Sequence, residues 1–249
     1  MHRFYVAPEN WDPHELALRG TEAHHARNVL RMQTGDKLVL FNGKGRELTA
    51  EIAKLADDEI RLRKLHEAET APLRCRIVLG QAIPKGKNMD LIVQKAVEIG
   101  AAEIAPIISD RTVVQVDTDT ATQKQSKWQQ IAIEAAKQCG QNWLPRVHTP
   151  KKLSEFFSGS VQPFDLRLIG SLQPDAQQLK KILQTYASEH GDRPRSVLML
   201  VGPEGDFTPA ELALARGQGC QPITLGPIVL RVETAAIYCL SVLSYELLI

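Results

Sequence analysis

Two glycine-proline loops near the C-terminus contain the residues best suited to bind a ligand. The first is Val201-Gly202-Pro203-Glu204-Gly205-Asp206, and the second runs from Leu225-Gly226-Pro227 to Thr234. Each loop follows an apolar run that predicts a buried strand, and each leads into a helical pattern. Glycine allows a backbone to approach a ligand, and loops at the carboxyl ends of strands in an α/β sheet bind small ligands. The pattern therefore indicates a ligand site, although two tight strand-to-helix connections would look the same.

Four charged side chains of these loops are the candidates for chemistry. Three are the carboxylates Glu204, Asp206 and Glu233, and the fourth is Arg231, the only cation between Arg216 and the C-terminus. A guanidinium can donate hydrogen bonds to an oxygen that gains negative charge during a reaction. Two structural alternatives remain open. Arg231 could instead pair with Glu204 or Asp206 and brace the loops, and Glu233 could stabilise the first turn of a helix.

Strands and helices must hold these loops in place. Buried strands are predicted over 197–201 and 223–225, and an apolar helix over 233–248. Between the loops, Thr208-Pro209-Ala210-Glu211 predicts a helix start with an N-cap threonine and a capping-box glutamate. Upstream, the pattern predicts a strand over 76–82, a helix capped by Asn88 and ending at Gly100, a strand over 104–108, a polar loop over 115–125, a helix over 127–139, a helix over 153–157, a strand over 166–169 and a helix over 176–186. This alternation is typical of a parallel α/β sheet.

The loop over 84–88 carries two lysines, Lys85 and Lys87, between the first strand and its helix. It lacks the GxxxxGK[ST] frame, and no GxGxxG occurs in the chain, which argues against ATP and NAD chemistry. The lysines are candidate contacts to RNA phosphates, with surface solubility as the alternative. Arg111 follows the next strand at the sheet end where sites form. Trp143 could stack on a base or simply pack.

The N-terminal part of the chain is mostly short strands. A hairpin is predicted from 37–41 and 47–53 around Asn42-Gly43-Lys44-Gly45, with a further strand over 60–65 and one helix from Thr21 to Leu30. Such a series of strands indicates a small barrel. The polar stretch 67–72 ends in proline and marks the expected domain boundary.

Basic residues of this part are candidates for RNA binding. Arg27 and Arg31 are four residues apart, so on a helix they share one face and can straddle phosphates, although a solvated face is the alternative. His24 and His25 have no acidic or cysteine partner at metal-ligand spacing, so no metal site is expected.

Seven motifs, in this order along the chain, resemble the RsmE family of ribosomal RNA uridine methyltransferases of the SPOUT class. The motifs are HRFYV at 2–6, HHARNVLRM at 24–32, Gly80–Gly86, Gln94–Gly100, Gln138–Gln141, LVGPEGDFTPAE at 200–211 and LGPIVLRVETAA at 225–236. The resemblance covers essentially the whole chain. It implies a PUA-like RNA-binding β-barrel over 1–72, followed over 73–249 by a SPOUT α/β trefoil-knot methyltransferase domain. This sequence departs from the family pattern at Asp206, where glycine is common, and at Ile228 and Val232, where arginine and threonine are frequent.

The resemblance also implies a function. The enzyme transfers a methyl group from S-adenosylmethionine, without metal, to N3 of a uridine in the 16S ribosomal RNA of the small subunit, and works as a homodimer. The implied cofactor-binding residues are Leu200, Val201, Gly202, Pro203, Glu204, Gly205, Leu225, Gly226, Ile228, Leu230, Arg231 and Thr234. Arg231 and Glu204 are the expected catalytic residues, and the expected RNA contacts are Arg3, Arg27, Arg31, Lys85, Lys87, Arg111 and Gln138. The alternatives are a noncatalytic RNA-binding assembly factor, or a SPOUT enzyme that modifies a transfer RNA or a ribose hydroxyl.

Composition sets the cellular expectations. The 249 residues are 43% hydrophobic and 24% charged, as in soluble globular proteins. The net charge of +1 argues neither for nor against a nucleic-acid partner. Four cysteines without CxxC pairing indicate reduced thiols. The start lacks a signal peptide and no stretch reaches transmembrane length, so a cytoplasmic protein with no membrane partner is expected.

Overall fold

The computed structural model describes residues 1–12, 15–56, 59–112, 118–159 and 163–248. The chain forms two compact units. The first contains Met1–Pro72 together with Ile133–Leu144, and the second contains Leu73–Ala132 and Pro145–Ile249. The domain boundary expected at 72 places 133–144 in the second domain, whereas the contacts of this segment group it with the first unit.

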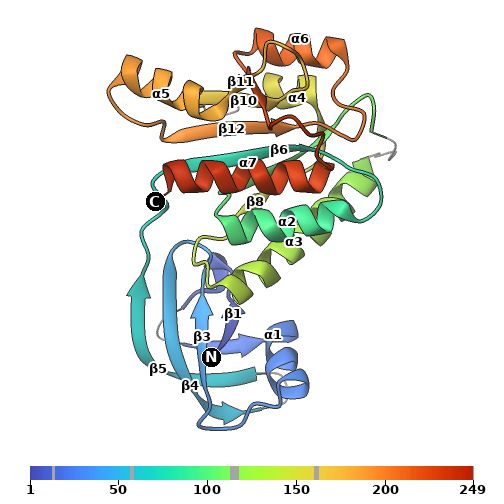
Figure 1. The fold of residues 1–249 in the computed structure, drawn as a ribbon. Coiled ribbons are helices and arrows are strands. Elements are labelled where there is room, and N and C mark those ends of the chain that lie inside the picture. Colours follow the sequence, from blue (N-terminus) through green and yellow to red (C-terminus); the bar gives the residue numbers. More distant parts are fainter. Residues whose placement is uncertain (13–14, 57–58, 113–117, 160–162, 249) are drawn as a thin grey trace. The chain divides into compact units, whose positions relative to one another are not determined.

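The first unit is built on a five-stranded mixed sheet with the order β1-β3-β4-β5-β2 (Figure 1). Its strands are β1 (His2–Tyr5), β2 (Ala17–Arg19), β3 (Lys37–Phe41), β4 (Arg46–Leu55) and β5 (Glu59–Glu69). Only the β1–β3 pair is parallel. The predicted hairpin is confirmed as β3 and β4, and the strand expected at 60–65 is confirmed within the longer β5. A short 3-10 turn, η1 (Pro8–Asn10), follows β1.

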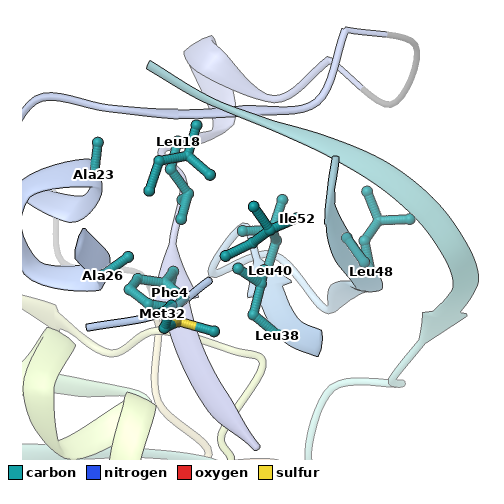
Figure 2. Packing of buried hydrophobic residues seen from close by; sticks show 11 residues of the cluster. Phe4, Leu18, Ala23, Ala26, Met32, Leu38, Leu40, Leu48 and Ile52 are labelled. Carbon is teal, nitrogen blue, oxygen red and sulfur yellow. The ribbon is translucent and has the colours of Figure 1, made fainter. Parts of the chain in front are cut away.

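Apolar side chains of alternate strand positions fill one face of this sheet. Figure 2 shows Phe4, Leu38, Leu40 and Ile52 packed together, and each of these side chains is at most 1% exposed. Alternation places Leu38 and Leu40 on the same side of β3. The helical segment after β2 closes this core with Ala23, Ala26 and, further along, Met32 (Figure 2).

The helix predicted from Thr21 to Leu30 has a different form. α1 covers Gly20–His24, and a π-helical turn, η2, covers His25–Val29. Arg19 is the N-cap of α1, one position before its first residue Gly20, and no side-chain hydrogen bond caps this helix. Arg31 lies beyond the helix end with a φ of 53°. The expectation that Arg27 and Arg31 share one helical face is therefore wrong, because the wider π turn and the left-handed residue break the 3.6-residue repeat.

Segment 133–144 is fixed to the first unit by hydrogen bonds. The Asn142 amide donates to Thr70 Oγ1 (2.9 Å) and accepts from Arg3, while the Trp143 indole donates to the Thr70 carbonyl (2.8 Å). The Trp143 ring covers Gly45, where a Cβ would meet it at 2.9 Å. Lys137 pairs with Glu22 at 3.1 Å. Trp143 is thus a packing residue, the structural one of its two predicted roles.

The second unit contains a parallel sheet with the order β11-β13-β10-β12-β6-β7-β8, with β9 beside β7 (Figure 1). Its strands are β6 (Arg76–Ala82), β7 (Glu103–Ile108), β8 (Arg146–Val147), β9 (Lys151–Lys152), β10 (Leu166–Gly170), β11 (Gln177–Gln178), β12 (Ser196–Val201) and β13 (Gln221–Thr224). Its helices are α2 (Asn88–Ile99), α3 (Thr118–Cys139, whose last turns belong to the first unit), α4 (Leu153–Ser158), α5 (Leu179–His190), α6 (Pro209–Gly217) and α7 (Val232–Leu247).

Helices cover both faces of this sheet. Leu198 and Leu200 of β12 pack with Leu212 of α6 and Leu153 of α4 on one face. α2 and α7 lie side by side on the other face (Figure 1). Since α6 precedes β13 and α7 follows it, the second glycine-proline loop carries the chain from one face of the sheet to the other. None of the described helices has the length and apolar character that a membrane crossing requires.

Most element predictions of this unit are confirmed, with differences at helix starts. α2 begins at Asn88, but Lys87 is its N-cap and no side chain caps it, so the predicted Asn88 cap is wrong. α3 starts at Thr118, because the polar residues predicted as loop form its first turns; 115–117 lie outside the described residues. The capping box of Thr208 and Glu211 is present as predicted.

Three ionisable groups join neighbouring strands at the amino end of this sheet. Arg76 on β6 approaches one Glu103 carboxylate oxygen at 2.6 Å, and His148 Nε2 lies 2.6 Å from the other. The hydrogen bond from His148, assisted by Arg76, lowers the pKa of Glu103 to about 2 despite partial burial. The cluster therefore holds β6, β7 and the end of β8 together.

Candidate functional site

A pocket of about 480 Å³ lies at the carboxyl ends of the adjacent strands β10, β12 and β13, where the two glycine-proline loops meet. Nearly all of the predicted cofactor-binding residues line it: Val201, Gly202, Pro203, Glu204, Leu225, Gly226, Ile228, Leu230 and Arg231. These residues come from two loops more than 20 positions apart in sequence. Parallel neighbouring strands bring their ends to one edge of the sheet, so the fold joins the two loops.

Three residues predicted with this set do not line the pocket. Leu200 is fully buried in β12, where its side chain packs across Gly80 of β6. Gly205 lies at the exposed tip of the first loop, and Thr234 is exposed on α7. Leu200 therefore supports the pocket from within the sheet and does not form its wall.

The pocket also has walls that the sequence prediction missed. The end of β10 contributes Gly170, Ser171 and Leu172, and the start of α2 contributes Asn88. Ser171 is buried and its backbone N–H donates to the Ile223 carbonyl at 3.0 Å, which joins β10 to β13. The available signal was the Gly-Ser pair directly after the predicted strand over 166–169.

The backbone of both loops needs small or left-handed residues. A Cβ on Gly202 would lie 3.1 Å from Asp206 Oδ1 and 3.3 Å from the Phe207 nitrogen. Gly226 has a φ of 114°, which L side chains rarely adopt. Asp206 has a φ of 63°, a conformation that aspartate tolerates better than most residues. The glycine common at this place in the family pattern and the aspartate found here both fit that backbone.

Two carboxylates of the site accept hydrogen bonds from the loop before α2 and from the first residue of that helix. Glu204 Oε1 accepts the backbone N–H of Lys85 at 2.9 Å. Glu233, in the first turn of α7, accepts the side-chain amide of Asn88 at 3.3 Å. The two hydrogen bonds tie β6's loop to both glycine-proline loops. Lys85 and Lys87 themselves are exposed beside the pocket.

Glu211 and Arg111 stabilise the first glycine-proline loop and the start of α6 through hydrogen bonds. The buried Glu211 carboxylate accepts from Ser109 Oγ (3.1 Å), from the Asp110 N–H (3.1 Å) and from Thr208. The Arg111 guanidinium donates to the Gly205 carbonyl. Arg111 thus braces the loop, a contact that its predicted RNA-binding role did not include.

Arg231 is the N-cap residue of α7 and lines the pocket with an exposed side chain. Across the residues described by the structure, its guanidinium has no hydrogen bond or ion pair. The alternative in which Arg231 braces the loops through Glu204 or Asp206 is therefore absent from this structure. Its donors are available to a ligand.

The expected RNA contacts of the first unit differ in availability. Arg3 is engaged by Glu47 at 2.7 Å and by Asn142, and its side chain is 14% exposed. Arg27 donates to the Ala56 carbonyl at 3.2 Å but is exposed, as are Arg31 and Gln138. Arg3 therefore serves the packing of segment 133–144, and the other three remain accessible.

The site suits an adenosine-like ligand of moderate size. Its volume lies in the range of small-molecule sites, and apolar side chains of Val201, Leu225, Ile228 and Leu230 form walls for a ring. Gly202 and Gly226 leave space for close backbone approach. Among the described residues, no group of three or more histidine, cysteine, aspartate or glutamate residues could hold a metal ion. Burial raises the pKa of Cys75, Cys220 and Cys239 to about 12, so these thiols are poor nucleophiles.

Comparisons with known families define the class of the protein. A family model described as an RNA methyltransferase domain matches residues 71–244, and a model described as an RNA methyltransferase PUA domain matches residues 18–65. The chain is thus a PUA domain followed by an α/β RNA methyltransferase domain, and the fold class predicted from the sequence is confirmed.

Individual relatives narrow the class to one family. The ribosomal RNA small subunit methyltransferase E of Bacillus subtilis is 30% identical over 93% of this chain and 90% of its own length. The methyltransferase of the same name from Neisseria gonorrhoeae, solved bound to S-adenosyl methionine, is 32% identical, with a TM-score of 0.84 over 99% of this chain and 98% of that chain. A Legionella pneumophila methyltransferase solved with SAM is 34% identical, with a TM-score of 0.84 over 98% of this chain and 97% of that chain. This chain belongs to the ribosomal RNA small subunit methyltransferase E family.

Proposed function

We propose that this protein transfers a methyl group from S-adenosylmethionine to N3 of a uridine in 16S ribosomal RNA, in the cytoplasm and without a metal. The observation that carries the proposal is the pocket formed by the two glycine-proline loops, in a chain whose relatives are solved with that cofactor. Apolar walls and glycine backbones suit the adenine ring and the ribose, respectively.

The chain's own groups supply what the reaction needs beyond positioning. S-adenosylmethionine supplies an activated methyl group on a sulfonium, so an in-line displacement by N3 needs alignment above all. The imide nitrogen must lose its proton while charge grows on the uracil carbonyl oxygens. Arg231 has unengaged donors beside the pocket and is assigned to those oxygens.

Glu204 is the carboxylate best placed to take the imide proton. It lines the pocket, is exposed, and has only Oε1 engaged, by the Lys85 N–H. Glu233 is the weaker candidate, because it is bound by Asn88 and sits in the first turn of α7, where any carboxylate is stabilised.

RNA binding is assigned to the domain over 1–72 together with the rim of the pocket in the domain over 73–249. Arg27, Arg31 and Gln138 are exposed in the first unit, and Lys85 and Lys87 are exposed beside the pocket. Cations of this kind supply contacts to phosphates, which position RNA without reading its sequence. The small ribosomal subunit is the proposed partner.

A homodimer is proposed on the apolar surface of α7. Tyr238 and Tyr245 lie seven residues apart on one side of the helix and are 47% and 71% exposed. Tyrosine is enriched at protein–protein interfaces relative to the rest of the surface. Sedimentation equilibrium should give a dimer for the wild-type chain and a monomer for Tyr238→Asp/Tyr245→Asp. A wild-type monomer at micromolar concentration would refute the proposal.

Two measurements test the activity. Isothermal titration should show binding of S-adenosylmethionine, unchanged by a chelator. Tritiated methyl groups should then enter small subunits taken from a strain that lacks this gene, and mass mapping should place them on one uridine base at N3. Cofactor binding without transfer would indicate a noncatalytic assembly factor, and label in transfer RNA or on a ribose hydroxyl would indicate a different substrate.

A further inference from the structure

The pocket carries a net negative charge, and its proposed cofactor carries a positively charged sulfonium. Three carboxylates, Glu204, Asp206 and Glu233, line it against one guanidinium, that of Arg231, which leaves a formal charge of −2. S-adenosylmethionine carries a sulfonium, whereas the product left after methyl transfer has a neutral thioether at the same atom. The two ligands therefore differ by one positive charge and by one methyl group.

Asp206 is fixed to the backbone of the first loop by two hydrogen bonds. Its Oδ1 accepts the Phe207 N–H at 2.7 Å, and its own N–H donates to the Pro203 carbonyl at 2.9 Å. Oδ1 lies 3.1 Å from the place that a Cβ on Gly202 would occupy, so the carboxylate stands directly beside the loop backbone. Throughout the described part of the chain, no cation pairs with it and no donor reaches Oδ2.

The other two carboxylates are compensated differently. Glu204 is exposed, so solvent screens its charge, and Glu233 faces the positive end of α7 and the Asn88 amide. Asp206 is half-buried and belongs to no helix. Its charge is thus the one of the three that acts on the pocket with the least compensation.

We infer that Asp206 makes this pocket select the cationic methyl donor over its uncharged product. The inference rests on the proposed function, since it takes S-adenosylmethionine and S-adenosylhomocysteine as the two ligands. Coulomb's law, at an effective dielectric constant of about 20 and for an assumed separation of about 12 Å, makes a unit negative charge favour a cation over a neutral group by about tenfold. Loss of that attraction when the methyl group leaves favours release of the product.

The test compares dissociation constants of the two ligands by isothermal titration. Asp206→Asn keeps an acceptor for the Phe207 N–H and tolerates the φ of 63°, but removes the charge. We expect Asp206→Asn to lower the preference for S-adenosylmethionine over S-adenosylhomocysteine by about tenfold, mainly because the affinity for S-adenosylmethionine falls. The wild-type preference for S-adenosylmethionine should also fall when the salt concentration rises from about 0.05 to about 0.5 M, because salt screens the attraction between the carboxylate and the sulfonium.

Two further variants complete the design. Glu189→Gln removes one negative charge from an exposed position of α5 outside the pocket and should leave the preference unchanged. Asp206→Gly also suits the left-handed backbone and replaces Asp206→Asn if that variant melts early. An unchanged preference in a folded Asp206 variant overturns the inference and leaves the proposed function intact. Failure of the wild-type chain to bind either ligand overturns both.

Discussion

Replacing Arg231 with methionine should slow methyl transfer strongly without destabilising the protein. The side chain is exposed, caps no backbone group through its own atoms and, among the described residues, pairs with nothing. Substitutions at such positions change the free energy of unfolding by about 0.5 kcal/mol or less. For a chain of this size the melting temperature should therefore move by only about 1–2 °C.

The rate should fall far more than the stability. Removal of one donor from a group that stabilises a developing oxyanion costs about 2.7–4 kcal/mol, or a hundred- to a thousandfold in rate. Single-turnover methylation of small subunits, with the enzyme in excess, measures that step without product release. Isothermal titration with S-adenosylmethionine should show no loss of cofactor affinity, because removing a cation from an acidic pocket does not weaken the binding of a cationic ligand. Arg146→Met, at an exposed arginine of β8 outside the pocket, is the matched control and should keep the wild-type rate.

Two results would refute the reasoning for Arg231. If cofactor affinity fell by as much as the rate, the guanidinium would bind the cofactor and would not act on the transition state. If the melting temperature fell by 5 °C or more, the side chain would be a brace that the structure does not contain.

Three further predictions follow from other parts of the molecule. Glu211→Ala leaves the Ser109 and Asp110 donors and the α6 cap unsatisfied, so urea unfolding should show a loss of about 2–4 kcal/mol, against little for the exposed first-turn Glu155→Ala of α4. Because the pKa of Glu103 is lowered from 4.5 to about 2 in the folded chain, its contribution to stability is complete above about pH 4.5 and is lost as the pH falls towards 2. Glu103→Gln should flatten this acid limb in thermal melts, and an unchanged slope would remove the ion cluster as its cause. Lys85→Ala/Lys87→Ala should reduce the salt slope of RNA binding by about 2 with unchanged cofactor affinity, whereas Lys180→Ala/Lys181→Ala on α5 should not.

Local patterns were sufficient to predict the parts of the site that a few adjacent residues determine. Thr208 and Glu211 form their capping box because both partners lie within one helical turn. Strand β6 has the predicted ends, since a continuous apolar run between charged and proline-containing segments indicates a buried strand. The predicted parallel α/β sheet also accounts for the meeting of the two glycine-proline loops, because both loops lie at the carboxyl ends of strands of that sheet.

Long-range contacts decided the features that local patterns missed. Asn88 is a residue type that often caps helices, yet its side-chain amide donates a hydrogen bond to Glu233, 145 positions away. Arg3 and Arg111, predicted as RNA contacts, also have protein partners that the sequence did not reveal, namely Glu47 and Asn142 for Arg3 and the Gly205 carbonyl for Arg111. The sequence around an arginine does not show which distant backbone carbonyl the fold will place beside its guanidinium.

The same distinction decides which candidate residues carry chemistry. A charged side chain that has no partner in the protein and lines a pocket can interact with a ligand without breaking an internal contact. Arg231 and the free oxygen of Asp206 are such groups, whereas Arg111, Glu211 and Glu233 are satisfied by the protein itself. Sequence records the residue type and not the long-range partner. The partner is what separates a brace from a group that acts on a ligand, and so the sharpest tests of this site are substitutions at Arg231 and Asp206, where function can change without the fold.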